Sequence, residues 1–257
     1  MRCMTWVGSI GGICEGPNLK GVGMASIEQI KLVMERRAQS FETSAAENSY
    51  RELAGEVGAT IAFLERLIVT KKGSYELPAM QLGLEMLFEG IVQLGAGLSR
   101  LAFYSLRSFS ELFGFAILIS ADQLKGRMWM AGMADLHWSE ISDVDKGILG
   151  HQYVNAFTVK SLTPDLSQVE ILKQSYRRCC EYVHSNPVTW VESQKDVIIK
   201  EWASQFGSLS SSLSFAFLIR NWDQAMDGEI LETVRVMLRD ANGSADYQQA
   251  LREKINE

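Results

Sequence analysis

The most apolar stretch of the chain, residues 98–120, places the strongest constraint on the fold. It carries aromatic and aliphatic side chains along its whole length: Leu101, Phe103, Leu106, Phe109, Leu112, Phe113, Phe115, Ile117, Leu118 and Ile119. Arg100, Arg107 and Glu111 interrupt it, so its uninterrupted apolar part is far shorter than the ~20 residues that a transmembrane helix needs. We therefore expect a helix buried at the centre of the protein, and no membrane partner.

Helical spacing of apolar residues also dominates the rest of the chain. Three- and four-residue steps predict a long amphipathic helix over 77–94, through Leu77, Met80, Leu84, Leu87, Ile91 and Leu94. Capping boxes predict helices that begin at Ser26, running to about Arg37, and at Ser49, running to about Lys71. No stretch reads convincingly as a strand. The sequence therefore predicts an all-α helical bundle.

The glycines and the two ends of the chain indicate how these helices are organised. Gly83, Gly90 and Gly97 recur every seven residues, which predicts close helix contact, and residues 95–97 should bend or end their helix. Helices are also expected over 196–206, 208–226, 229–241 and 245–255. The predicted organisation is a flexible tail at 1–25, N-terminal helices at 26–75, a helical core at 76–190 and a C-terminal helical extension at 191–257. The glycine-rich tail lacks the lysine of a phosphate-binding loop and is not expected to bind nucleotide.

Composition narrows the classes of function. The 257 residues have a formal net charge of −6, which argues against a broad, non-specific nucleic-acid binder but leaves room for a local basic site. The four cysteines have no zinc-type spacing, so reduced thiols in a cytoplasmic protein are expected. The acids around His137 match no specific metal-ligand spacing, and neither a metal nor another cofactor is expected.

The segment 163–184 carries the clearest boundary signals. Thr163 suits an N-cap, Pro164 the first helical position and Asp165 the positive end of the helix dipole. Asn186 precedes Pro187, which disfavours helical geometry in the residue before it. The expected buried face consists of Leu166, Val169, Leu172, Tyr176, Cys180 and Val183.

A polar stripe, consisting of Arg177, Glu181 and His184, runs beside that face. Arg177 and His184 are seven residues apart and therefore point the same way to within about 20°. A permanent cation, an anion and a side chain that titrates near neutrality could transfer a proton next to a phosphate. The same three residues could equally form a solvated, salt-bridged helix surface.

A second polar row lies on the apolar helix at 98–120, where Arg100, Tyr104, Arg107 and Glu111 follow at four-, three- and four-residue steps. Buried charges need partners, so we expect this row to face the polar stripe. Glu111 would then pair with Arg177 or Arg178. The alternative is an internal pair between Arg107 and Glu111.

The segment from Tyr176 to Pro187, Tyr-Arg-Arg-Cys-Cys-Glu-Tyr-Val-His-Ser-Asn-Pro, resembles the signature helix of the HEPN superfamily. In that signature an arginine, usually followed by a polar residue, precedes a histidine by four to six intervening residues. Arg177, followed by the polar Arg178, and His184 match with six residues between them. Residues 105–111 are similar to the partner helix of many members, and Trp129 follows at a plausible place. The resemblance covers residues 76–190.

The resemblance implies a helical bundle that is often dimeric, and in active members a metal-independent endoribonuclease. Such proteins occur in toxin–antitoxin modules, anti-phage defence and CRISPR-associated effectors. His184 would act as general acid or base, Arg177, backed by Arg178, would stabilise the phosphorane, and Glu181 would position them. Arg107, Glu111 and Asn186 would have supporting roles. The products would be a 2′,3′-cyclic phosphate and a 5′-hydroxyl.

The same resemblance leaves a non-catalytic alternative. Arginine follows Arg177 where asparagine, aspartate or histidine is more usual, and many relatives have lost catalysis. The chain would then be a helical scaffold or regulatory module that binds a protein partner or RNA. The partners expected under the two hypotheses are RNA, a second copy of the chain, and a protein such as an antitoxin or sensor.

Overall fold

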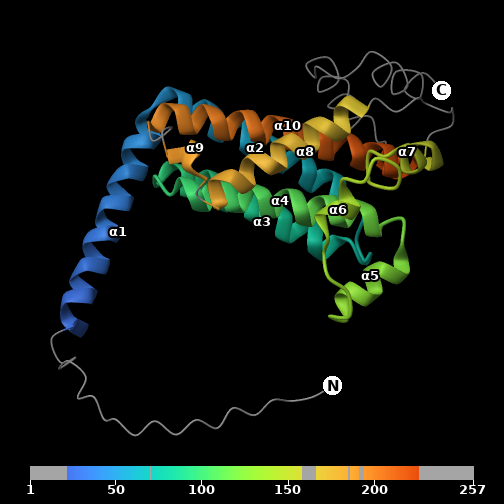
Figure 1. Cartoon of the computed structure of the whole chain (residues 1–257), viewed down its shortest axis with the longest axis horizontal. Coiled ribbons are helices and arrows are strands. Elements are labelled where there is room, and N and C mark those ends of the chain that lie inside the picture. The colour runs from blue at the N-terminus through green and yellow to red at the C-terminus, as the bar shows by residue number, and fades with distance from the viewer. Residues whose placement is uncertain (1–21, 70, 158–165, 185, 191–193, 226–257) are drawn as a thin grey trace, which may run out of the picture.

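A computed structural model describes residues 22–69, 71–157, 166–184, 186–190 and 194–225 (Figure 1). Within these ranges the chain is helical and has no strand, which confirms the predicted all-α class. The helices are α1 (Val22–Ala46), α2 (Asn48–Val69), α3 (Leu77–Gly95), α4 (Ser99–Ile119), α5 (Gln123–Met130), α6 (Trp138–Ile141), α7 (His151–Phe157), α8 (Leu166–Val183), α9 (Pro187–Trp190) and α10 (Lys195–Ala225).

Helix α4 lies at the centre of the bundle and packs against α3, α8 and α10. All five residues at 113–117 are buried, which is expected only where a helix is covered on every side. The predicted central buried helix is therefore confirmed. Of the described helices, α4 alone is long and apolar enough to cross a membrane, but 67 % of its apolar window is buried inside the bundle. This is weak evidence for a membrane span, since the core helix of a globular protein has the same properties.

Helices α3 and α4 approach each other closely because α3 carries glycine at two contact positions. A Cβ atom on Gly83 would lie 3.5 Å from the backbone nitrogen of Phe113. One on Gly90 would lie 3.4 Å from the carbonyl oxygen of Ala102 and 3.2 Å from the Trp202 ring. The close helix contact predicted from the glycine repeat is thus confirmed at these two positions.

The third glycine of the repeat, Gly97, ends α3 instead of packing against a helix. Its φ of +69° lies in the left-handed region that favours glycine. The amide of Leu98 donates to the carbonyl of Gln93 at 2.8 Å, and the amide of Gly97 to that of Leu94 at 3.0 Å. This pair of bonds is a Schellman motif, and it confirms the predicted helix end at 95–97.

Helix α1 begins earlier and ends later than predicted. It is already helical at Val22, so the expected capping box at Ser26 is wrong. It continues past Arg37 to Ala46 because its second half docks on the body: the Phe41 ring meets the Tyr50 ring edge-on, and the Ser44 hydroxyl donates to the carbonyl of Gly95 at 2.7 Å. The first half projects away from the bundle (Figure 1). Helix α2 begins at Asn48, so Ser49 lies inside it and not at its N-cap.

The expected break between helices at 196–206 and 208–226 is absent, since α10 (Lys195–Ala225) runs through residue 207 without interruption and kinks only later, at Asn221 (φ −118°, ψ 18°). One apolar stripe crosses the expected break and keeps both halves on the core: Trp202, Phe206, Leu209, Leu213 and Phe217 are all buried. Residues 163–165, 229–241 and 245–255, for which a helix start and two helices were predicted, lie outside the described residues. Helices α2, α3, α4, α8 and α10 contribute to a single apolar cluster.

Candidate functional site

Helix α8 packs against both α4 and α10, between which it lies in Figure 1, and this position sets which of its side chains are covered. Val169 and Leu172 are buried as predicted. Cys179 and Tyr182 are also buried, whereas Tyr176, Cys180 and Val183, which were expected to form the buried face, are only partly covered. The buried face differs from the predicted one at Tyr182, which stacks on Phe103 of α4, with ring centroids 3.8 Å apart and planes 6° from parallel.

Tyr176 occupies the side of α8 that faces α4. Its hydroxyl donates to Oε1 of Glu111 at 2.5 Å and accepts from Nε of Arg107 at 3.1 Å. Trp138 of α6 stacks on the Tyr176 ring at 3.8 Å and covers it from solvent. Burial and the bond to Glu111 raise the pKa of Tyr176, so the phenol stays protonated and keeps donating.

Glu111 pairs within its own helix. Nη2 of Arg107 lies 3.0 Å from Oε1 of Glu111, and Nε donates to the same oxygen at 3.1 Å. The expected pairing of Glu111 with Arg177 or Arg178 is therefore wrong. The reason is that Tyr176, and not an arginine, is the α8 residue that points at α4. Arg107 and Glu111 hold Tyr176 and thereby fix the rotation of α8.

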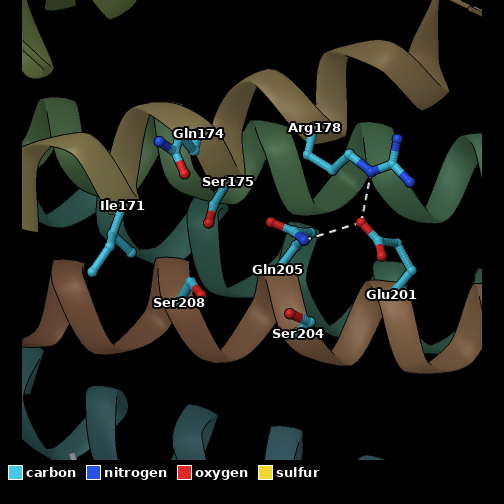
Figure 2. A pocket seen from close by; sticks show the side chains of 8 residues that line it. All are labelled: Ile171, Gln174, Ser175, Arg178, Glu201, Ser204, Gln205 and Ser208. Atoms are coloured by element: carbon cyan, nitrogen blue, oxygen red, sulfur yellow. Dashed lines mark hydrogen bonds and ion pairs between the residues drawn. The ribbon is translucent and has the colours of Figure 1, made fainter. Parts of the chain in front are cut away.

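Arg178 points the opposite way, toward α10. Figure 2 shows its Nε atom donating to Oε1 of Glu201 at 2.7 Å, with Gln205 donating to the same oxygen at 3.1 Å. Nη1 of Arg178 also donates to Oε2 of Glu181 at 3.0 Å, and its guanidinium lies 5.1 Å from the centre of the Tyr182 ring. Arg178 therefore ties α10, through Glu201, to Glu181 on the polar stripe.

A polar groove of about 430 Å³ continues along this seam between α8 and α10. Arg178 and Glu201 close one end of the groove, and Figure 2 shows hydroxyl and amide side chains along its walls. The lining residues are Ile171, Gln174, Ser175, Arg178, Glu201, Ser204, Gln205 and Ser208.

The polar stripe faces outward from α8. The side chain of Arg177 is 82 % exposed, and its Nε atom lies 3.7 Å from Oε1 of Glu181, which is largely covered. His184 is exposed and follows directly after the helix, with its amide donating to the carbonyl of Cys180 at 2.9 Å. Asn186, which is half-buried, fixes this end further through an amide bond to the carbonyl of Glu181 at 2.9 Å. Arg177 and Glu181 thus lie in the last two turns of α8, and His184 directly follows the helix.

Two residues of α4 were passed over as site candidates although they belong to its polar row. Phe103 lies against Tyr182, and Arg107 lies against Tyr176, so α4 and α8 run antiparallel. The exposed Arg100 and Tyr104 are therefore level with the end of α8 that carries His184. The sequence signal for Arg100 and Tyr104 was their four-residue spacing in line with Arg107, which places them on the same face of α4.

The acids near His137 do not gather around a common point. Glu140 forms an ion pair with Lys125, and Asp143 accepts from the backbone amides of Asp145 and Lys146. No group of three or more potential metal ligands occurs within the described ranges.

The arrangement on α8 combines a solvent-exposed guanidinium, a carboxylate anchored by a second arginine, and an accessible imidazole. Such a set can bind an anionic oxygen and move a proton next to it. Comparison of the chain with protein-family models, with curated proteins and with solved structures finds no match. The functional assignment therefore depends on the chemistry of these side chains.

Proposed function

We propose that the protein is a metal-independent endoribonuclease whose catalytic residues are Arg177 and His184. The observation that carries the proposal is the contrast between the two neighbouring arginines. Arg178 holds α8 to α10, whereas Arg177 is 82 % exposed, and His184, seven residues further along the chain, is exposed as well. A guanidinium that extends into solvent beside an accessible imidazole is suited to a phosphodiester substrate.

The reaction is an internal transfer at phosphorus. His184 takes the proton from a ribose 2′-hydroxyl, and the 2′-oxygen forms a bond to phosphorus as the bond to the 5′-oxygen breaks. The leaving 5′-oxygen receives a proton from an imidazolium, either of this His184 or of a second copy across a dimer. Arg177 stabilises the extra negative charge on the phosphorane. The products are a 2′,3′-cyclic phosphate and a 5′-hydroxyl.

Glu181 and Arg178 act as positioning residues in this proposal. Glu181 accepts from Arg178 through one carboxylate oxygen and approaches Arg177 with the other. Arg178 bonds both Glu181 and, on α10, Glu201, so the position of Arg177 depends on the contact between α8 and α10. Arg100 and Tyr104 of α4 would extend the RNA-binding surface, with a cation for phosphate and a ring for base stacking.

The test is cleavage of total RNA and tRNA by the full chain in the presence of EDTA, followed by mapping of the ends. Wild type should leave cyclic phosphates, and both His184→Ala and Arg177→Ala should lose at least 100-fold in rate, as expected for a general acid–base residue (~10²–10⁴-fold). His137→Ala is the matched control, because His137 is also exposed but lies outside the stripe. Equal cleavage by wild type and His184→Ala, or no cleavage by wild type, would rule out the proposed mechanism.

A second candidate function is a non-catalytic helical module that assembles through α1. Ile27, Ile30 and Met34 are exposed and follow at three- and four-residue steps. The same spacing continues through Arg37, Phe41 and Ser44, whose side chains meet the body of the protein. One continuous face of α1 is therefore packed in its second half and uncovered, within the described residues, in its first. Heptad spacing of this kind suits pairing with the same helix of a second copy.

Sedimentation velocity at matched concentrations tests this assembly. Wild type should sediment as a dimer, and Ile30→Glu combined with Met34→Glu should sediment as a monomer. Leu32→Glu is the control, because Leu32 is also exposed but lies on the other side of α1. A monomeric wild type would exclude the module, and a dimer without RNA cleavage would favour it over the nuclease.

A further inference from the structure

A second pocket, of about 360 Å³, lies where the turn between α2 and α3 meets the end of α4. Residues 71–76 form one wall, Ile119, Ser120 and Gln123 form another, and Arg220 of α10 closes it. The pocket is remote from the polar stripe, since Ile119 is 16 residues along α4 from Phe103, or about 24 Å at 1.5 Å per residue.

The described lining of this pocket is positively charged, although the whole chain carries −6. Lys71, Lys72 and Arg220 contribute three positive charges and Glu76 one negative charge, which leaves a formal +2. The side chains of Lys71 and Glu76 are only 6 % and 10 % exposed, and Nζ of Lys71 is 3.9 Å from Oε1 of Glu76, a long ion pair. Burial lowers the pKa of Lys71, and the nearby charge of Arg220 adds to that shift against the effect of Glu76.

Two donors in this lining lack an acceptor among the described residues. Arg220 donates through Nη2 to the carbonyl of Ser120 at 2.6 Å and lies 4.5 Å from the centre of the Phe157 ring. Within the described part of the chain, its buried Nε atom has no hydrogen-bond partner, and neither has the buried hydroxyl of Ser74. A buried donor left unbonded is destabilising, so both groups would gain from an acceptor brought into the pocket.

We propose that this pocket binds a small oxyanion, specifically the phosphate group of a soluble phosphate or phosphate monoester. A tetrahedral oxyanion offers several acceptor oxygens, which can take the N–H of Arg220 and, after rotation about its χ1 bond, the hydroxyl of Ser74. Its negative charge offsets the excess of the cationic lining and relieves the repulsion between Lys71 and Arg220. The volume exceeds that of inorganic phosphate, which leaves room for an attached organic group beside Tyr75 and Ile119. This site is separate from the proposed nuclease centre and does not depend on it.

The experiment is calorimetric titration of the full chain with inorganic phosphate, with chloride at equal ionic strength as the reference. We expect saturable binding of phosphate and none of chloride. Arg220→Gln should raise the Kd at least tenfold. Ser74→Ala, in the turn before α3, should raise the Kd several-fold. If Arg220→Gln does not fold, this variant alone tests the site. Arg51→Gln, which removes an exposed arginine of α2, should leave the Kd unchanged.

A parallel titration with ribose 5-phosphate separates the two forms of the ligand. A lower Kd than that of inorganic phosphate assigns the site to a phosphate monoester, and an equal Kd assigns it to phosphate itself. The absence of saturable phosphate binding by wild type would overturn the proposal. So would binding that Ser74→Ala and a folded Arg220→Gln leave unchanged.

Discussion

Substitution of Gly95 by alanine tests how tightly α1 and α2 close over the end of α3. A Cβ atom at Gly95 would lie 2.5 Å from the Tyr50 hydroxyl oxygen, 2.7 Å from its Cζ atom and 2.8 Å from Cδ2 of Phe41. These separations are too short for any contact, so both rings would have to move. The Tyr50 hydroxyl donates to the carbonyl of Ile91 at 2.8 Å, and this buried bond would be lost as the ring shifts.

The expected change in the free energy of unfolding is the sum of two losses and one gain. Overpacking a tight core costs about 1–3 kcal/mol, and the lost hydrogen bond costs about 1 kcal/mol more. Replacing glycine by alanine in a helix returns up to about 1 kcal/mol. Gly95→Ala should therefore lower the free energy of unfolding by about 1–3 kcal/mol, which corresponds to a fall in Tm of roughly 4–8 °C at the middle of that range.

Guanidinium unfolding and calorimetry of Gly95→Ala and Gly58→Ala measure the effect. Gly58 is the matched control, because it is a helical glycine of α2 and a Cβ atom added there would meet no other described residue within 4 Å. Alanine at position 58 should therefore stabilise the protein by about 0.5–1 kcal/mol. In a Tyr50→Phe background the cost of Gly95→Ala should shrink by about 1 kcal/mol, since the closest contact and the hydrogen bond are already gone. A Gly95→Ala protein as stable as Gly58→Ala would refute the packing described for α1, α2 and α3.

Within each pair of neighbouring residues on α8, the two members should differ: the arginines in their effect on stability, and the cysteines in their reactivity. Arg178→Ala should lower the free energy of unfolding by about 1–2 kcal/mol, because its bonds to Glu201 and Glu181 are largely covered, whereas Arg177→Ala should change it by less than about 0.5 kcal/mol. Urea unfolding of both variants checks this, and equal losses would contradict the assigned orientations. Cys179 is buried, and burial raises the pKa of its thiol, so iodoacetamide should modify it only after unfolding. Peptide mapping by mass spectrometry should find the partly exposed Cys180 modified first, and modification of Cys179 in the native protein would contradict its burial.

Periodicity in the sequence was sufficient to predict the helical class, the central helix α4 and the end of α3. These features depend on local patterns: a run of apolar residues, a glycine repeat and a glycine at a helix end. The length of α1 was underestimated because it depends on Phe41 and Ser44 meeting residues of α2 and α3, which no local pattern reveals. The continuation of α10 through residue 207 was missed for the same reason, since it depends on the buried stripe from Trp202 to Phe217, which packs on the core on both sides of that residue.

At the candidate site, the spacing of Arg177, Glu181 and His184 predicted one shared face; in the structure Arg177 and Glu181 form an ion pair on α8, and His184 is exposed directly after the helix. Spacing could not determine the partner of each charge. Glu111 was expected to reach an arginine of α8, but the rotation of α8 about its own axis, set by Tyr182 on Phe103, presents Tyr176 to α4 instead. A rotation of about one residue step, roughly 100°, decides whether Tyr176 or Arg177 points at α4.

The outward orientation of Arg177 and His184 has a consequence for how this chain can change over generations. Neither side chain supports the core, because the contacts that hold α8 in place are made by Tyr176, Arg178 and Tyr182. Replacements at positions 177 and 184 are therefore expected to be nearly neutral for folding. Over generations these two exposed positions can therefore be exchanged in single steps, without passing through an unfolded form.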